Sequence, residues 1–148
     1  MLALAPASRP QKIYELGSGW GLMAIRLGRQ YPDSSVVGIE ISLVPYLISR
    51  ILVYLLAGPN VTITRGDFRS HDLADGGLLM CYLYPGAMTH LSKQLAEQLP
   101  HGSTVISNTF RLPGWTPVRE VELSDLYRSR VYRYDVPVGL PEPGESSA

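Results

Sequence analysis

The chain alternates short apolar runs with longer stretches in which apolar residues recur every three to four positions. Apolar runs bounded by Gly, Pro, Asn or Asp are typical of buried strands, whereas the longer amphipathic stretches favour helices. Strands are expected at residues 12–16, 34–41, 61–67, 77–84 and 102–110, and helices at residues 21–31, 43–57 and 87–99. Strands that alternate with helices and are apolar enough to be buried on both faces predict a mostly parallel sheet.

The pattern changes after residue 110. A turn-rich connector, RLPGWTP, leads into two strand-like runs at residues 118–123 and 128–136, close enough in sequence to form an antiparallel hairpin at one edge of the sheet. With right-handed crossovers, the predicted fold is α/β, three-layer and doubly wound, with a seven-stranded, mostly parallel sheet. We expect one domain over residues 1–136 and a disordered tail, rich in Pro, Gly and Ser, over residues 137–148.

The longest apolar stretch is LVPYLISRILVYLLAG, at residues 43–58. A helix that spans a membrane needs about 20 apolar residues, and this stretch is shorter and contains Pro45 and Arg50. The favoured interpretation is a helix that is buried on most of its circumference. The alternative, which is not favoured, is a helix that contacts a membrane or a partner protein and makes a cytoplasmic protein membrane-associated.

Composition and charge exclude several classes of function. Lys+Arg and Asp+Glu balance at 13 each, so the chain has no general attraction to nucleic acid or to an anionic membrane. The single cysteine, Cys81, lies in an apolar run and is expected to be a core residue rather than a nucleophile, which suits a reducing cytoplasm. The three histidines share no metal-ligand spacing, and no metal is expected.

The motif that carries chemistry is YELGSGWG, at residues 14–21, between the first expected strand and the first expected helix. In an open parallel sheet, ligands bind at the carboxyl ends of the strands, where this loop begins. Gly17, Gly19 and Gly21 have the spacing G-x-G-x-G, whereas a dinucleotide-binding loop needs its third glycine one residue later. A carboxylate at Glu15, beside the loop, suits a cationic ligand better than a pyrophosphate.

ELGSGWG resembles motif I of the class I S-adenosylmethionine-dependent methyltransferases, in which the acid supports the amino group of the cofactor. The resemblance implies a second acid that binds the ribose hydroxyls and a third beside the adenine amino group. Glu40, in VVGIEI, and Asp67, in TRGDF, follow the second and third expected strands. The cofactor-binding residues implied for S-adenosyl-L-methionine, and for its product S-adenosyl-L-homocysteine, are Glu15, Gly17, Ser18, Gly19, Gly21, Glu40, Ile41, Asp67 and Phe68.

A closer resemblance, over about residues 12–136, is to the small archaeal and bacterial protein-lysine methyltransferases. These are similar to the mitochondrial enzymes that methylate lysine in ATP synthase subunit c and in the adenine nucleotide translocase. The resemblance rests on ELGSGWG, on VVGIEIS and above all on GSTVISNTFRLPGWTP followed by VYRYDV. It implies a protein substrate with an accessible lysine. The chain departs from the family in having only about a dozen residues before motif I, where members usually carry a helical segment, and in having YLYP after the fourth strand.

A lysine acceptor must be neutral to attack a sulfonium methyl group, and a dry channel beside a cation lowers the pKa of an ammonium group. Residues at the end of the fourth strand are placed to build such a channel. Tyr82 and Tyr84 alternate with Leu83, so we expect them on one side of that strand, with Tyr84 as the channel wall or hydrogen-bond partner and Tyr82 more readily in the core. Asn108 is the other catalytic candidate, with a plain hydrogen bond at the end of a strand as the alternative. Trp115 is expected to staple the connector to the sheet, with a place in the substrate groove as the alternative.

Two alternatives stay open. The first is a methyltransferase that acts on a small molecule or on RNA, although the neutral charge argues weakly against RNA and no N-P-P-Y-like signature of amide methylation follows the fourth strand. The second is a module that binds the cofactor without turnover, or an inactive truncated copy, which the short stretch before motif I motivates. No visible motif specifies the acceptor protein, the degree of methylation or the oligomeric state.

Overall fold

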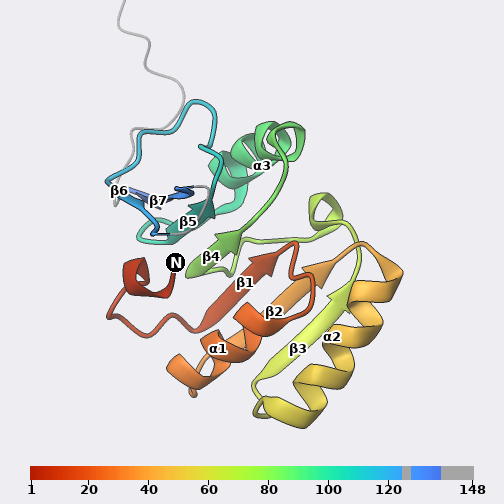
Figure 1. The fold of residues 1–148 in the computed structure, drawn as a ribbon. Helices are drawn as coiled ribbons and strands as arrows, with labels where there is room; N and C mark the ends of the chain where they lie inside the picture. The colour runs from red at the N-terminus through yellow and green to blue at the C-terminus, as the bar shows by residue number, and fades with distance from the viewer. Residues whose placement is uncertain (125–127, 138–148) are drawn as a thin grey trace, which may run out of the picture.

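The computed structural model describes residues 1–124 and 128–137 of the 148-residue chain. Within them, strands form a single seven-stranded sheet in the order β3-β2-β1-β4-β5-β7-β6 (Figure 1). The strands are β1 (Lys12–Leu16), β2 (Ser35–Glu40), β3 (Val61–Arg65), β4 (Leu78–Cys81), β5 (Thr104–Asn108), β6 (Arg119–Glu122) and β7 (Arg130–Asp135). The helices are α1 (Leu22–Gln30), α2 (Leu43–Leu56) and α3 (Pro85–Gln98), with the 3-10 turns η1 (Leu2–Leu4) and η2 (Phe68–Ser70).

The order and direction of the strands confirm the predicted doubly wound α/β fold. Strands β1 to β5 run parallel, whereas β7 is antiparallel to both β5 and β6, so the last two strands form the expected hairpin at one edge. Helices α1 and α2 cover one face of the sheet and α3 covers the other (Figure 1). Residues 138–148, which make up most of the predicted disordered tail, lie outside the described residues.

Two apolar clusters, one on each face of the sheet, form the core. In β1, Ile13 packs into the cluster on the α1 face, whereas Tyr14 and Leu16 pack into the cluster on the α3 face. Successive side chains of a strand point to opposite faces, so Glu15 shares the α1 face with Ile13. This alternation places a carboxylate among apolar neighbours at the end of β1.

The residues before β1 pack against the sheet. Leu4, in η1, is buried in the cluster on the α1 face. Side chains from two other elements bind the backbone of this segment: the guanidinium of Arg133 donates to the carbonyl oxygen of Leu4 at 3.0 Å, and the hydroxyl of Tyr31 donates to that of Pro6 at 2.6 Å. These contacts hold Met1 next to the loop that follows β1.

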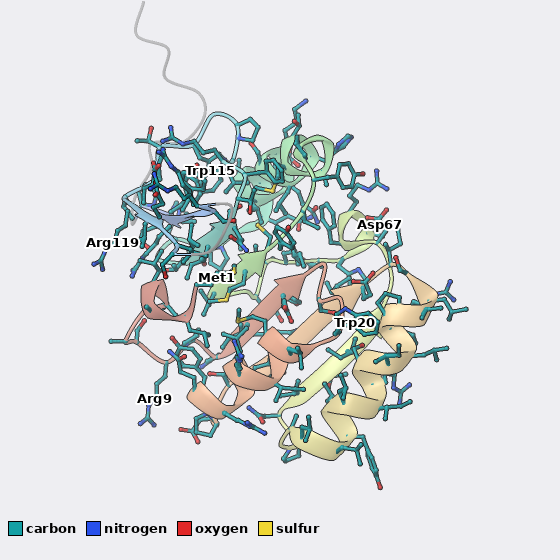
Figure 2. The ribbon with its side chains drawn as sticks, viewed as in Figure 1. Met1, Arg9, Trp20, Asp67, Trp115 and Arg119 are labelled. Atoms are coloured by element: carbon teal, nitrogen blue, oxygen red, sulfur yellow. The ribbon has the colours of Figure 1, made fainter. Side chains whose placement is uncertain are left out.

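Helix α2 is not buried on most of its circumference, so the prediction for this stretch is wrong. Ser49 is its single buried residue, and Tyr46 and Val53 pack partly against the cluster on the α1 face. The helix lies over β2 and β3, and β3 is the edge strand, so the outer side of α2 is open and its side chains project away from the sheet (Figure 2). Tyr54 is 87% exposed. In the described part of the chain, no helix is long and apolar enough to cross a membrane.

Gly28 tests how closely α1 packs on the sheet. A β-carbon at this position would lie 2.2 Å from Cγ2 of Val61 in β3, well inside van der Waals contact. Replacing Gly by Ala in a helix normally stabilises it by about 1 kcal/mol. Here we expect Gly28→Ala to lower the free energy of unfolding by roughly 1–3 kcal/mol, measured by urea denaturation, because overpacking outweighs helix propensity. In a Val61→Ala background the same change should cost less, and a Gly28→Ala variant more stable than the parent would contradict the close packing.

Candidate functional site

The loop between β1 and α1 is tied by its backbone to the end of β2. The N–H groups of Gly17 and Ser18 both donate to the carbonyl oxygen of Ile39, at 2.9 and 3.1 Å. At Gly17 φ is 72°, a conformation that L side chains rarely adopt, and a β-carbon there would lie 3.0 Å from the Leu83 side chain and 3.1 Å from the Tyr82 carbonyl oxygen. Glycine therefore allows the loop to pass close to the segment that follows β4.

Glu40, at the end of β2, has a buried carboxylate that accepts two backbone hydrogen bonds. Its Oε2 accepts from the N–H of Gly19 at 2.7 Å, and its Oε1 accepts from the N–H of Ser42 at 2.8 Å. A carboxylate oxygen can accept more than one hydrogen bond, so both oxygens keep capacity for the two adjacent hydroxyls of a ribose. The predicted ribose acid is thus held in one orientation beside the glycine loop.

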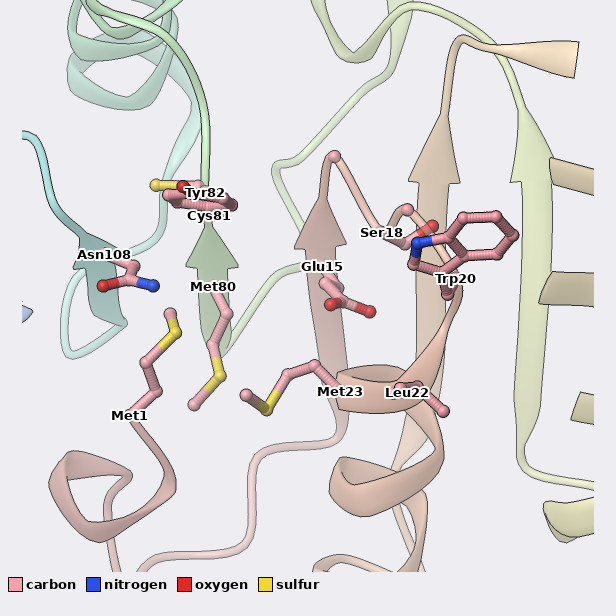
Figure 3. Close-up of a pocket in the computed structure, with 12 residues that line it drawn as sticks. Met1, Glu15, Ser18, Trp20, Leu22, Met23, Met80, Cys81, Tyr82 and Asn108 are labelled. Atoms are coloured by element: carbon pink, nitrogen blue, oxygen red, sulfur yellow. The ribbon is translucent and has the colours of Figure 1, made fainter. Parts of the chain in front are cut away.

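A pocket of about 370 Å³ opens beside this loop on the α1 face of the sheet (Figure 3). It is lined by Met1, Glu15, Gly17, Ser18, Gly19, Trp20, Leu22, Met23, Met80, Cys81, Tyr82 and Asn108. The side chains of Met1, Met80 and Met23 lie between Asn108 on one side and Glu15 on the other (Figure 3). Because the walls are mainly apolar, a charged group of a ligand has few possible partners in this pocket.

Glu15 is the carboxyl group that lines the pocket. Its side chain is buried, and among the described residues neither its Oε2 atom nor the hydroxyl of Ser18 has a hydrogen-bond partner. Burial raises the pKa of the Glu15 carboxyl to about 8; a hydrogen bond from the backbone of Ala24 opposes the rise, and the nearby charge of Glu40 adds to it. A buried carboxylate without a partner is costly, and an ammonium group would satisfy it. The pocket therefore fits the methionine part of S-adenosylmethionine.

A smaller cavity, of about 90 Å³, shares Gly17 with the larger pocket. The predicted adenine residues Asp67 and Phe68 line it, together with Ile41 and Tyr84. The structure thus brings most of the predicted cofactor residues to two cavities that meet at one glycine. A ligand with a charged amino-acid end and a flat base at the other end matches this arrangement.

Two of the predicted cofactor residues have additional or different contacts. Gly21 lines neither cavity; it is the N-cap of α1, and a β-carbon on it would lie 3.0 Å from the Ser49 side chain in α2. Asp67 accepts hydrogen bonds from the backbone N–H and the guanidinium of Arg69, which lower the pKa of the Asp67 carboxyl. An adenine amino group would therefore share this carboxylate with Arg69.

The structure corrects the expectation that Tyr82 and Tyr84 lie on one side of a strand. Strand β4 ends at Cys81, and Pro85 begins α3. Tyr84 has extended backbone angles, φ −71° and ψ 159°, which are typical of a residue before proline. Both tyrosines are exposed, so core packing is wrong for Tyr82. They line different cavities, Tyr82 the larger and Tyr84 the smaller.

Asn108, at the end of β5, lines the larger pocket as Tyr82 does. Its side-chain oxygen accepts a hydrogen bond from the Thr109 hydroxyl at 3.4 Å. Sequence reasoning missed the apolar walls of this pocket, which are Met1, Trp20, Leu22, Met23 and Met80. An apolar residue in a strand or helix is read as core, and only the packing of three separate segments brings these side chains to one cavity.

Trp115 and Cys81 have the expected structural positions. The indole N–H of Trp115 donates to the carbonyl oxygen of Ser92 in α3 at 3.3 Å, and its ring meets that of Tyr134 edge-on at 6.1 Å, which confirms that it staples the connector. Burial raises the pKa of the Cys81 thiol to about 12, so this side chain stays neutral and unreactive. No cluster of His, Cys, Asp and Glu in the described residues could hold a metal ion.

Comparisons with known proteins agree with this geometry. Residues 15–119 match the family described as ANTKMT methyltransferase domain. A protein-lysine N-methyltransferase of Saccharolobus islandicus is 25% identical over 127 residues, covering 84% of this chain and 78% of the relative. An adenine nucleotide translocase lysine N-methyltransferase of Mus musculus is 32% identical over 132 residues, covering 86% of this chain and 55% of the relative. The chain therefore spans about half the length of the mouse enzyme.

Solved structures share the fold. An RNA methyltransferase from Salinibacter ruber in complex with S-adenosyl-L-homocysteine has a TM-score of 0.83 and 32% identity, and the match covers 95% of this chain and 90% of that one. TrmN from Thermus thermophilus has a TM-score of 0.71 and 20% identity, covering 89% of this chain and 46% of that one, which is a likeness of fold alone.

Replacing Glu40 tests the ribose contact. We expect Glu40→Gln to weaken binding of S-adenosylmethionine about tenfold, because the charged acceptor of two hydroxyl hydrogen bonds is lost. Calorimetric titration of the folded variant measures the affinity. Asp33→Asn, which removes an exposed carboxylate paired with Arg9, is the matched control and should bind as the parent does. Equal affinities for Glu40→Gln and the parent would break the assignment.

The raised pKa of Glu15 predicts a pH dependence of cofactor binding. An ammonium ligand stabilises the carboxylate and lowers its pKa, so below about pH 8 the protein must release a proton when it binds. Affinity should therefore rise between about pH 6 and pH 8, by up to about tenfold per pH unit, and fall at higher pH as the amino group of the cofactor loses its own proton. Calorimetry in buffers of different ionisation enthalpy measures the released proton. The Glu15→Gln variant should bind S-adenosylmethionine more weakly, with an affinity that does not change between about pH 6 and pH 8. If the variant keeps the pH dependence of the parent, another group causes that dependence.

Proposed function

The chain belongs to the ANTKMT methyltransferase domain family, and we propose that it transfers the methyl group of S-adenosylmethionine to a lysine side chain of a protein. Family membership confirms the expected fold, cofactor and type of reaction. The lysine acceptor is supported by the two curated relatives, both of which are lysine N-methyltransferases. A reducing cytoplasm as the compartment is consistent with a single, buried cysteine.

One observation supports the proposal at the level of the site: Glu15, whose buried carboxyl group has an unpartnered oxygen, lines a pocket with mainly apolar walls. A ligand that satisfies it must bring a cation into a place from which water is largely excluded. Glu40 and Asp67 then lie at the ends of the next two strands, where a ribose and a base would follow. A cofactor with an amino-acid end and a nucleoside end meets all three requirements.

When bound, the cofactor supplies an electrophilic methyl group, so the protein needs no nucleophile of its own. The residues of the chain bind and align: Glu15 holds the amino group, Glu40 the ribose hydroxyls, and Phe68 with Tyr84 the faces of the base. The lysine, once its ammonium group has lost a proton to water, would accept this methyl group, and S-adenosyl-L-homocysteine would be the product that leaves. Most of the rate gain is therefore proximity and orientation.

The acceptor nitrogen must be uncharged before it attacks. Met1, Met23 and Met80 line the larger pocket and exclude water from it, and desolvation lowers the pKa of an ammonium group. Tyr82 and Asn108 are the polar side chains on the side of the pocket away from Glu15 (Figure 3). We assign them to orienting the amine by hydrogen bonds, and we assign Tyr84 to the cofactor rather than to the acceptor.

RNA is the second candidate acceptor, because the protein from Salinibacter ruber with a TM-score of 0.83 is described as an RNA methyltransferase. The formal net charge of zero argues against it. Incubation of the purified chain with radiolabelled S-adenosylmethionine and cell extract separates the two. Label that is removed by protease, survives ribonuclease and appears as methyl-lysine in the hydrolysate supports the proposal. Label that is removed by ribonuclease alone contradicts it.

The two tyrosines should affect different steps. We expect Tyr84→Ala to weaken cofactor binding roughly tenfold with a smaller effect on kcat, since it removes a wall of the small cavity. Tyr82→Phe should leave cofactor affinity unchanged and lower kcat roughly tenfold, because it removes a hydroxyl beside the acceptor. Single-turnover rates and calorimetric affinities for both variants separate the effects. If Tyr82→Phe weakens cofactor binding and Tyr84→Ala lowers kcat alone, the assignment is reversed.

A further inference from the structure

Helix α2 presents an unpartnered apolar face on its outer side. The exposed apolar side chains of the helix are Leu43, Val44, Leu47, Ile51, Tyr54, Leu55 and Leu56. At 100° per residue, the first six of these positions fall on one side of the helix, opposite the stripe of Tyr46, Ser49 and Val53 that packs toward the sheet. A contiguous exposed apolar face of this size is unusual for a soluble domain and marks a surface that binds something.

The apolar surface continues beyond the helix. Ile41 precedes α2, and Trp20 and Leu22 lie at the start of α1; all three are about half exposed or more. Trp20 and Leu22 also line the larger pocket. Exposed apolar side chains at the start of α1 therefore also form part of the wall of the pocket.

Among the described residues around this face, the charged side chains that have no acidic partner are arginines; Asp67, which lines the small cavity together with Ile41, is paired with Arg69. Residues 41–66 contain no Asp or Glu. Arg26, Arg29, Arg50 and Arg65 are exposed on α1, α2 and β3. Among the described residues, none of the four forms an ion pair with a carboxylate; Arg50 donates to the Tyr46 hydroxyl at 3.3 Å and Arg29 to the carbonyl oxygen of Leu56 at 2.8 Å. The chain as a whole has no net charge, so the positive charge of this face comes from where the arginines lie and not from an excess of basic residues.

We infer that the α2 face, defined as α2 with Ile41, Trp20 and Leu22, docks on the surface of an anionic lipid bilayer. Apolar side chains enter the boundary between headgroups and acyl chains, and the arginines meet lipid phosphates. A helix of 14 residues is about 21 Å long, too short to span the hydrocarbon core, so it lies in the plane of the interface. Exposed tyrosine suits that depth.

Charge complementarity selects the bilayer over a second copy of the chain. In a two-fold symmetric dimer the same surface meets itself, so the arginines of one α2 face would approach those of the other. Residues 41–66 supply no carboxylate to pair with them. An anionic membrane offers both an apolar layer and a dense array of negative charge. The inference does not depend on which acceptor the enzyme methylates.

Vesicle sedimentation tests the inference. We expect the chain to bind vesicles of phosphatidylcholine mixed with phosphatidylglycerol about tenfold or more tightly than vesicles of phosphatidylcholine alone. The double variant Leu47→Gln with Ile51→Gln should partition to the mixed vesicles at least about tenfold more weakly, because it removes two apolar side chains that enter the bilayer on binding. Arg50→Gln should lose about fivefold on the mixed vesicles and nothing on phosphatidylcholine alone.

Val118→Gln is the matched control, because Val118 is 60% exposed but belongs to the connector before β6. It should bind vesicles as the parent does. Equal calorimetric affinities for S-adenosylmethionine would show that the variants are folded and would keep this test separate from that of the methyltransferase function. Three results would overturn the inference: no preference for anionic vesicles, an equal loss in Val118→Gln, or a dimer in light scattering that the double variant abolishes.

Discussion

The arrangement of the site depends on one buried carboxyl group, that of Glu15, in which one oxygen has no hydrogen-bond partner among the described residues. Glu15 faces the α1 layer because β1 alternates its side chains between two apolar clusters, and burial there raises its pKa to about 8. Burying such a group lowers the stability of the ligand-free protein, and a bound cation offsets this loss of free energy. The apolar walls therefore contribute to recognition of the ligand. They offer no hydrogen-bond donor to the unpartnered oxygen of Glu15, so this oxygen stays available to an ammonium group of the ligand.

The other residues of the cofactor site follow Glu15 along the carboxyl ends of the parallel strands β1, β2 and β3. The glycine loop donates two hydrogen bonds to the end of β2 and a third to Glu40, so its backbone and the ribose acid are positioned by the same turn. Gly17 lines both cavities, and a side chain there would collide with the segment after β4. Gly17 and Gly21 therefore have a steric cause in this chain, whereas a β-carbon on Gly19 would meet nothing within 4 Å and only its φ of 51° favours glycine.

Most of the fold could be predicted from the sequence because it follows from local patterns, whereas the cofactor residues are implied by the resemblance of ELGSGWG to motif I. Strand β1 and the loop acids Glu15 and Glu40 are set by periodicity and by neighbours in the chain. The acceptor half could not be predicted in the same way. Aromatic alternation looks the same in a loop as in a strand, so the sequence predicts Tyr82 and Tyr84 as strand residues. Pro85, which begins α3, carries no information about which cavity each tyrosine lines. The methionine walls depend on packing between segments distant in sequence.

The burial of helix α2 could not be predicted from the sequence either, because burial depends on how many elements surround the helix. An apolar run predicts burial when enough elements surround it, yet this helix lies over an edge strand and needs only a narrow stripe to stay attached. Its first turn is also bound to the cofactor site, because the N–H of Ser42 donates to Glu40. Any partner that shifts the start of α2 acts on the orientation of the ribose acid through that hydrogen bond.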